Sequence, residues 1–467
     1  MKEWERSEGW VLVWIVIASG LILFFNLWAR NLEYHGYVRY AEVAREMIRS
    51  GEWVVPHLNG DIFIDKPPLL FWLIAIPSSL YGAVTPFIAR LPSAFSAWIG
   101  VIILFLWGKR IYGTPRSGLV AAGILLSSYQ YFFQSRLAKT DTLLCLFILL
   151  SLFFFHLGYG CDRNGRSRYL FNGLCFFFMG LGTLVKGPFG IVIPFLVIFL
   201  FLIKERRWKI FVGKEFIMGY AIFALTILPW IGLFITRVGL QESIRLISEN
   251  KILSSHAPVY FYFVEIWGQF APWSLLLPFL TFYLWRERRK VWNSEESIFL
   301  IWFISLFVVL TLFKIRASRY LLPALPPLAL MIGGRWRKRF SFFLIPFLLS
   351  ILIWHSVEAY WATEDISHSY GMLLTEELRP FLRDPALFGY RLDPNLMEEI
   401  NLYLDPVVPV RILKGAGGVS DQLRKKEKGL VLMPKEVYQN LRMQVDFSVV
   451  FLHEFRYKKG SLVLVSN

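Results

Sequence analysis

Long apolar runs separated by short basic loops dominate the chain as far as about residue 357. Several of these runs carry no Asp, Glu, Lys or Arg, and each approaches the roughly 20 residues that a helix needs to cross a bilayer. They are Trp10 to Trp28, Leu91 to Gly108, Ser117 to Ser135, Tyr169 to Val185, Phe216 to Thr236, Ile266 to Trp285 and Ser297 to Phe313. The pattern predicts a polytopic all-α membrane protein.

Lys and Arg gather in short loops between these runs, and such loops face the cytoplasm in membrane proteins. We therefore expect a cytoplasmic N-terminus, and we expect 69–81, interrupted by Pro77, to be re-entrant or interfacial. The predicted spans are 10–30, 86–108, 117–136, 142–160, 169–185, 187–203, 215–236, 260–285, 297–313, 320–334 and 340–357. These 11 transmembrane helices are an odd number, so the C-terminal segment is expected on the outer face.

Two regions follow from this topology. Residues 1–357 form the transmembrane domain with a long outer loop at 31–66, in which Val38 to Arg49 has the pattern of an amphipathic helix at a membrane surface. Residues 358–467 alternate short β-prone runs with polar helical stretches, which predicts a small soluble α/β domain.

The composition of the 467 residues agrees, since 56% are hydrophobic and only 18% are charged. A net charge of +16 would suggest nucleic acid as a partner of a soluble chain, but here the positive charge lies in loops and sets topology. The first apolar run lacks a small-residue cleavage site, so we interpret it as a retained span rather than a signal peptide. Membrane lipids, and not nucleic acid, are the expected surroundings.

Ionisable residues recur where the predicted spans meet the outer face, although charges there are costly unless they serve a site or find partners. Cations in such a place can hold a phosphate, and a carboxylate can deprotonate an attacking hydroxyl group. This pattern is typical of an enzyme that transfers a sugar from a lipid phosphate. The residues are Asp65, Lys66, Arg136, Asp141, Lys186, Lys314, Arg316 and Arg319.

Three motifs of the first loop carry a family resemblance: Arg39-Tyr40-Ala41-Glu42, the run Gly51 to Gly60, and Asp65-Lys66-Pro67-Pro68. They resemble the first outer loop of the bacterial aminoarabinose lipid A transferases, relatives of the protein O-mannosyltransferases within the GT-C glycosyltransferases. Further matches, among them Ala89-Arg90-Leu91-Pro92 and Lys186-Gly187-Pro188, extend the resemblance over roughly residues 10 to 335.

The resemblance implies a GT-C enzyme of the cytoplasmic membrane whose outer, periplasmic cavity takes a sugar from a polyprenyl phosphate. The acceptor is a lipid or glycan, lipid A or another envelope glycan, and the donor makes a nucleotide cofactor unnecessary. Inversion at the anomeric carbon also follows from the family. The expected donor-phosphate-binding residues are Lys66, Arg90, Arg136, Lys186, Lys314 and Arg319.

The resemblance also implies a divalent metal ion held by Asp65 and His256, although the family commonly has Glu at the position of Asp65. A second departure concerns the catalytic acid, because Gly36 and Tyr37 stand where the family has an Asp-Glu pair. Glu33 lies one helical turn earlier and could serve as the base, since a general base needs only hydrogen-bond reach of the acceptor hydroxyl. Asp141 is the other candidate.

Other functions remain open at this stage. A protein O-mannosyltransferase-like enzyme would share the motifs, and a catalytically inactive homologue would explain Gly36 and Tyr37. A lipid-phosphate transporter or flippase would also need many spans and a cationic site, but it predicts symmetric halves that this chain lacks. The oligomeric state is not indicated by the sequence.

Overall fold

The computed structural model describes residues 2–32, 38–161, 165–249, 257–313, 316–336 and 340–368, and shorter stretches from 374 to 466. The chain divides into two compact units. Unit 1 comprises Met1–Leu27, Ile64–Leu73 and Arg90–Glu358, and unit 2 comprises Trp28–Phe63, Ile74–Ala89 and Ala359–Asn467.

Helices dominate the described chain. Five of them have segments long and apolar enough to cross a membrane: α4 (Pro86–Tyr112), α7 (Thr140–Tyr159), α8 (Arg166–Lys186), α10 (Lys214–Val238) and α17 (Phe340–His368). Shorter apolar segments belong to α1 (Lys2–Phe24), α3 (Leu69–Tyr81), α9 (Phe189–Lys204) and α15 (Ser297–Leu312). The 13 residues of α3 rise only about 20 Å, less than the roughly 30 Å of a bilayer core. The chain is therefore a polytopic, mostly helical membrane protein.

Three regions predicted as single spans are broken in the structure. Residues 117–136 divide at an extended Ser128 into α5 (Pro115–Ser127) and α6 (Tyr129–Ser135). Residues 260–285 divide into α12 (Phe261–Gln269), the 3₁₀ helix η2 (Trp273–Leu276) and α13 (Leu277–Arg286). Residues 320–334 begin in η3 (Ser318–Ala324) and continue in α16 (Leu325–Trp336). Prolines stand at or beside the last two breaks, because proline cannot donate the backbone hydrogen bond that an α-helix requires.

The remaining helices of the described chain are short connections. They are η1 (Trp208–Val212), α11 (Leu240–Glu249) and α14 (Arg288–Trp292).

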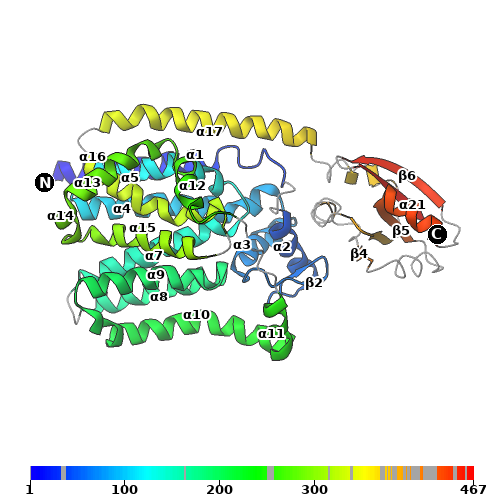
Figure 1. Ribbon diagram of the computed structural model, residues 1–467, viewed down its shortest axis with the longest axis horizontal. Coiled ribbons are helices and arrows are strands. Elements are labelled where there is room, and N and C mark those ends of the chain that lie inside the picture. Colours follow the sequence, from blue (N-terminus) through cyan, green and yellow to red (C-terminus); the bar gives the residue numbers. More distant parts are fainter. Residues whose placement is uncertain are drawn as a thin grey trace. The chain divides into compact units, whose positions relative to one another are not determined.

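Helices α7, α8, α9 and α10 lie side by side in unit 1 (Figure 1). Glycines let α8 and α9 approach closely: a Cβ atom added at Gly190 would lie 2.1 Å from the carbonyl carbon of Gly182. No side chain fits in that space. The contact therefore holds the C-terminal end of α8 against α9.

Trp107 of α4 lies at the centre of an aromatic cluster inside unit 1 and is fully buried. Its ring centroid lies 5.0 Å from that of Phe299 and 6.2 Å from that of Trp302, both on α15, and 5.7 Å from that of Phe153 on α7. Edge-to-face and offset aromatic pairs add to the energy of burial. The cluster joins three helices that are distant in the sequence.

Unit 2 contains the first loop, whose amphipathic segment forms α2 (Val38–Ser50) as predicted. Its surroundings differ from the predicted position at a membrane surface, because the charged side chains of Glu42 and Arg45 are buried inside the protein. The Arg45 guanidinium donates to both Glu42 carboxylate oxygens, through Nε at 2.8 Å. Burial raises the pKa of Glu42 to about 7, although Arg45 opposes the shift.

A short hairpin of β1 (His57–Leu58) and β2 (Asp61–Ile62) follows α2. Its turn residues, Asn59 and Gly60, have φ values of 55° and 82°, the left-handed conformation that suits a tight hairpin. The Glu46 carboxylate of α2 accepts from the backbone N–H of Gly60 at 3.2 Å. This contact fixes the hairpin to the helix.

The C-terminal part of unit 2 has a five-stranded sheet in the order β4-β3-β5-β7-β6. Strands β4, β3 and β5 are parallel to one another, whereas β7 pairs antiparallel with both β5 and β6. One helix of the described residues, α21 (Lys435–Gln444), follows β5. The strands are β3 (Ala386–Gly389), β4 (Arg411–Ile412), β5 (Gly429–Pro434), β6 (Val450–Tyr457) and β7 (Gly460–Ser466).

The contact between α8 and α9 can be tested with Gly190→Ala. The added methyl group would force the two backbones apart, and overpacking of this kind costs about 1–3 kcal/mol. We expect a lower melting temperature of the purified protein in detergent. Gly232→Ala on α10 is the matched control, because an added Cβ there meets no atom within 4 Å. Equal melting temperatures of the two variants would contradict the close packing.

Candidate functional site

A buried ion pair joins the beginning of α7 to the end of α8. The Lys186 ammonium donates to Oδ1 of Asp141, and the Asp141 side chain is 5% exposed. Charges are stable at such low exposure only when they are paired and hydrogen-bonded. Two residues predicted from the sequence, one as a catalytic acid and one as a phosphate ligand, therefore meet in the structure.

Local sequence places both groups at helix ends. Asp141 lies in the first turn of α7, where the helix dipole stabilises a negative charge. Helix α8 ends at Lys186 because Gly187 adopts a φ of 64°, which favours glycine, and Pro188 follows it. The Gly187 N–H bonds to the carbonyl of Thr183 at 2.8 Å, which completes the helix end.

A second cation approaches the same carboxylate. Arg319 Nε of η3 lies 3.9 Å from Oδ2 of Asp141, and the Arg319 side chain is 42% exposed. The backbone of this region is held in place by Gln130, whose side-chain amide donates to the carbonyl of Ser318 at 2.6 Å. Tyr262 contributes from α12, since its hydroxyl accepts from the backbone N–H of Ala317 at 3.3 Å.

Tyr320 lies against both cations. Lys186 Nζ is 4.4 Å from the centroid of its ring, and the Arg319 guanidinium carbon is 5.2 Å from it. A cation over an aromatic face is stabilised by about 0.5–2 kcal/mol. Asp141, Lys186, Arg319 and Tyr320 also line a small cavity of about 20 Å³, which is closed on its apolar side by Phe189 and Pro323.

Lys139, two residues before Asp141, completes a group that we call the ionic cluster: Lys139, Asp141, Lys186 and Arg319. Burial lowers the pKa of Lys139 to about 8, and the nearby charges of Arg319 and Lys186 lower it further while Asp141 opposes them. Lys139 and Tyr320 are not among the site residues predicted from the sequence. Their places in the sequence, two residues before Asp141 and directly after Arg319, are the features by which they could have been predicted.

The ionic cluster has three cationic side chains for one carboxylate. Ammonium and guanidinium groups close together favour an anion with several acceptor oxygens, such as a phosphate monoester. A phosphate has the acceptor oxygens that ammonium and guanidinium groups bind. The cluster can therefore hold an anionic group at the ends of three structural elements.

Lys66 and Asp65 form a separate pair in unit 1. Lys66 Nζ donates to Oδ1 of Asp65 at 2.7 Å and to the Asp65 carbonyl at 2.9 Å. This arrangement does not fit a metal site at Asp65, because the Lys66 ammonium already occupies one carboxylate oxygen and would repel a metal cation. Among the described residues, no three His, Cys, Asp or Glu side chains are placed to share a metal ion.

Two of the predicted phosphate-binding residues donate hydrogen bonds to backbone carbonyls instead. Arg90 is buried and donates to the carbonyl of Leu27 at 3.0 Å. Arg136 is also buried; it donates to the carbonyl of Leu23 at 3.1 Å, and its Nε lies 3.4 Å from Oε1 of Glu358. Neither residue lines the cavity of the ionic cluster. These contacts tie α4 and the end of α6 to α1 and α17.

Three other predicted site residues, Glu33, Lys314 and His256, lie outside the described residues. Gly36 and Tyr37, which replace the acidic pair of the family, lie outside them as well. Their predicted roles as base, phosphate ligand and metal ligand stay predictions.

Comparison with known proteins identifies relatives of the chain. Residues 65–232 match the family model described as dolichyl-phosphate-mannose-protein mannosyltransferase. An uncharacterized protein of Aquifex aeolicus is 26% identical over 73% of this chain and 67% of its own length. The undecaprenyl phosphate-alpha-4-amino-4-deoxy-L-arabinose arabinosyl transferase 1 of Pseudomonas fluorescens is 28% identical over 70% of this chain and 60% of its own. The match thus spans about three fifths of that transferase.

Solved structures share the fold. ArnT from Cupriavidus metallidurans, bound to undecaprenyl phosphate, superimposes with a TM-score of 0.80 over 98% of each chain at 19% identity. An oligosaccharyltransferase from Archaeoglobus fulgidus has a TM-score of 0.58 over 96% of this chain and 72% of its own at 11% identity. At these identities the structures show that the chain has the fold of ArnT and of the oligosaccharyltransferase.

Proposed function

We propose that this protein is an integral membrane glycosyltransferase that transfers a sugar from a polyprenyl phosphate to a lipid or glycan acceptor. The observation that carries the proposal is the ionic cluster, in which Lys139, Lys186 and Arg319 lie close to the carboxylate of Asp141. A polyprenyl phosphate released from its sugar is a phosphate monoester, whose oxygens accept hydrogen bonds from ammonium and guanidinium groups. The Cupriavidus structure, which has the same fold, holds undecaprenyl phosphate.

In the proposed reaction the acceptor hydroxyl oxygen attacks the anomeric carbon of the sugar and the bond from that carbon to the phosphate oxygen breaks. The hydroxyl proton passes to a carboxylate, and the bonding electron pair leaves with the phosphate. Direct displacement inverts the anomeric carbon. The cations of the cluster stabilise the negative charge that grows on the leaving phosphate, which lowers the barrier because the charge is larger in the transition state.

The contacts of Asp141 favour a positioning role over that of the base. A carboxylate that accepts from an ammonium is a weaker base, because taking up a proton would break that interaction. Asp141 instead orients Lys186 and brings Arg319 to the same point. We therefore assign proton removal to Glu33 and the holding of the cations to Asp141.

The finer features of the proposal follow the relatives. The periplasmic face is proposed for the ionic cluster, with 11 spans and the C-terminal sheet on that side. Lipid A or another envelope glycan is the proposed acceptor, since the Pseudomonas relative is named as an aminoarabinose transferase. A protein hydroxyl is the alternative acceptor, since the matched family model describes a protein mannosyltransferase.

The function is tested by mass spectrometry of lipid A, envelope glycans and envelope proteins from a strain lacking the gene. Complementation with the wild type should restore a mass that differs by one sugar, and this mass identifies sugar and acceptor. Lys186→Met should lower transfer roughly 100-fold, the usual effect of removing one group that stabilises transition-state charge. Lys209→Met, which changes an exposed lysine of η1, is the matched control and should restore full transfer.

Identical masses in the deletion and wild-type strains, in every fraction, would exclude the transferase and favour the transport or inactive alternatives. Asp141→Asn separates the two roles of Asp141. A positioning residue should raise the apparent KM for the donor as well as lower kcat, whereas loss of a base should lower kcat alone.

Lys139 predicts a pH dependence of donor binding. Its pKa of about 8 means that it is charged below that pH and loses its charge as the pH rises through it. The apparent KM for the donor should therefore rise above pH 8. Lys139→Met should show the higher KM at all pH values, by roughly 10-fold for one charged hydrogen bond.

Lys139→Arg is the decisive comparison, because a guanidinium stays charged over this whole range. Its KM should stay low above pH 8, where that of the wild type rises. Parallel pH profiles of the wild type and Lys139→Arg would show that Lys139 does not contact the donor.

A further inference from the structure

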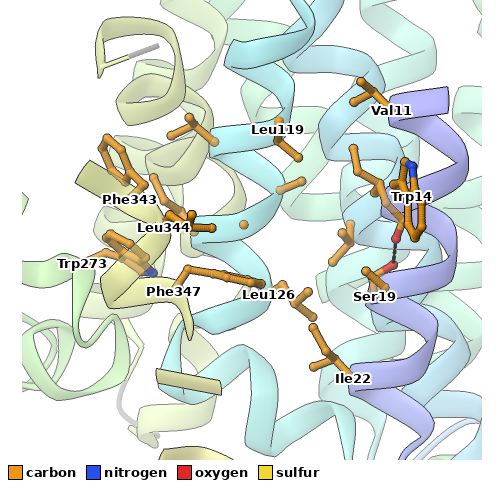
Figure 2. Close-up of a pocket in the computed structure, with 17 residues that line it drawn as sticks. Val11, Trp14, Ser19, Ile22, Leu119, Leu126, Trp273, Phe343, Leu344 and Phe347 are labelled. Atoms are coloured by element: carbon orange, nitrogen blue, oxygen red, sulfur yellow. Dashed lines mark hydrogen bonds between the residues drawn. The ribbon is translucent and has the colours of Figure 1, made fainter. Parts of the chain in front are cut away.

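An apolar cavity of about 390 Å³ lies between α1, α5 and α17 of unit 1 (Figure 2). Trp14 and Val11 of α1 face it from one side, Leu119 and Leu126 of α5 form its floor, and Phe347 of α17 lies opposite α1. The volume is more than twice the roughly 150 Å³ of an engineered apolar cavity that binds benzene. The space is therefore large enough for a ligand.

The cavity continues along α1. A second, more open cavity of about 670 Å³ lies farther along the same two helices, lined by Phe25 at one side and by Ile351 and His355 of α17 at the other. Ile22 lines both cavities, so they adjoin along α1, and we refer to the two adjoining cavities as the groove between α1 and α17. From Val11 to Phe25 the groove is about 20 Å long, since each helical residue rises 1.5 Å.

Two polar side chains that line the first cavity, Ser19 and Trp273, make hydrogen bonds within the protein. The Ser19 hydroxyl donates to the carbonyl of Ile15 at 2.5 Å, and the Trp273 indole N–H donates to the hydroxyl of Ser127 at 2.9 Å. An apolar cavity without free polar partners does not hold ordered water. Its occupant is accordingly a hydrocarbon without a polar group at this depth.

The source of that hydrocarbon is the surrounding bilayer. Trp14 is 65% exposed and Leu344, on the α17 side, is 46% exposed, so the groove opens toward the lipid-facing surface of two apolar helices. The groove is somewhat longer than one leaflet, which is half of a hydrocarbon core of about 30 Å. The chain of a polyprenyl donor is a poorer candidate, because the cavity of the ionic cluster shares no lining residue and no helix with the first cavity.

We propose that the groove between α1 and α17 binds one fatty acyl chain of a bilayer phospholipid. Helix α17 is otherwise held to this unit by a few contacts, such as the Trp354 indole N–H, which donates to the carbonyl of Ser127 at 2.8 Å. An acyl chain in the groove adds packing between α1 and α17, which also meet where the Phe25 and His355 rings lie 5.6 Å apart. This site does not depend on the proposed transferase function.

Photolabelling in nanodiscs of phosphatidylethanolamine and phosphatidylglycerol tests the site. A phosphatidylethanolamine with a diazirine in its acyl chain should label peptides that contain Leu119 to Leu126 and Phe343 to Phe347. Gly123→Leu would fill the cavity, because a Cβ at Gly123 lies 3.7 Å from the Phe347 ring, an ordinary contact. Labelling should fall about fivefold or more, which corresponds to about 1 kcal/mol of binding free energy.

Gly232→Leu on α10 adds the same side chain in open space and should label as the wild type does. Equal labelling of the two variants at the groove would overturn the proposal. So would preferential labelling of these peptides by a polyprenyl phosphate that carries a diazirine in its chain. A second test uses the wild type, so it does not depend on the folding of a variant. The melting temperature of the delipidated protein should rise when phosphatidylethanolamine is added back. An unchanged melting temperature would contradict the site.

Discussion

The ion pair between Asp141 and Lys186 is the interaction on which the geometry of the candidate site depends. Ionised groups in apolar surroundings are stable only with partners, so the pair fixes the beginning of α7 relative to the end of α8. Hydrogen bonds to the backbone of Ser318 and Ala317 hold the neighbouring Arg319 near the same carboxylate. A site at the ends of several helices can present several charges to one ligand, while the remainder of each helix stays apolar.

Much of the helical fold follows from hydropathy, but the interruptions do not. The helices at α7, α8, α10 and α15 agree with the predicted ranges within a few residues, because each is a long apolar run between polar boundaries. The breaks at Ser128 and within 260–285 and 320–334 lie inside apolar sequence. A hydropathy profile cannot predict a helix break at a serine or proline when the residues on both sides are apolar.

The site shows a similar limit. Asp141, Lys186 and Arg319 could be selected because charges at span ends are costly, and the structure brings these three together. Arg90 and Arg136 satisfied the same rule, yet they bind backbone carbonyls near α1. An arginine at the end of a span needs hydrogen-bond acceptors. Tertiary contacts decide whether the backbone or a ligand supplies them, and these contacts cannot be read from the sequence. The fold matches that of the Cupriavidus ArnT at 19% identity, and a shared fold alone does not determine which residues bind a ligand.

The buried pair of α2 has a consequence for the charge of the first loop. The formal net charge of +16 treats every acid as ionised, yet the pKa of Glu42 is raised by burial to about 7, so this carboxyl is partly protonated at neutrality. Acidification of the medium removes this negative charge while Arg45 keeps its positive one. Because burial raises this pKa, the ionised form of Glu42 costs folding free energy, and the cost falls as the pH drops below about 7. The first loop is therefore expected to gain stability, rather than lose it, in mild acid.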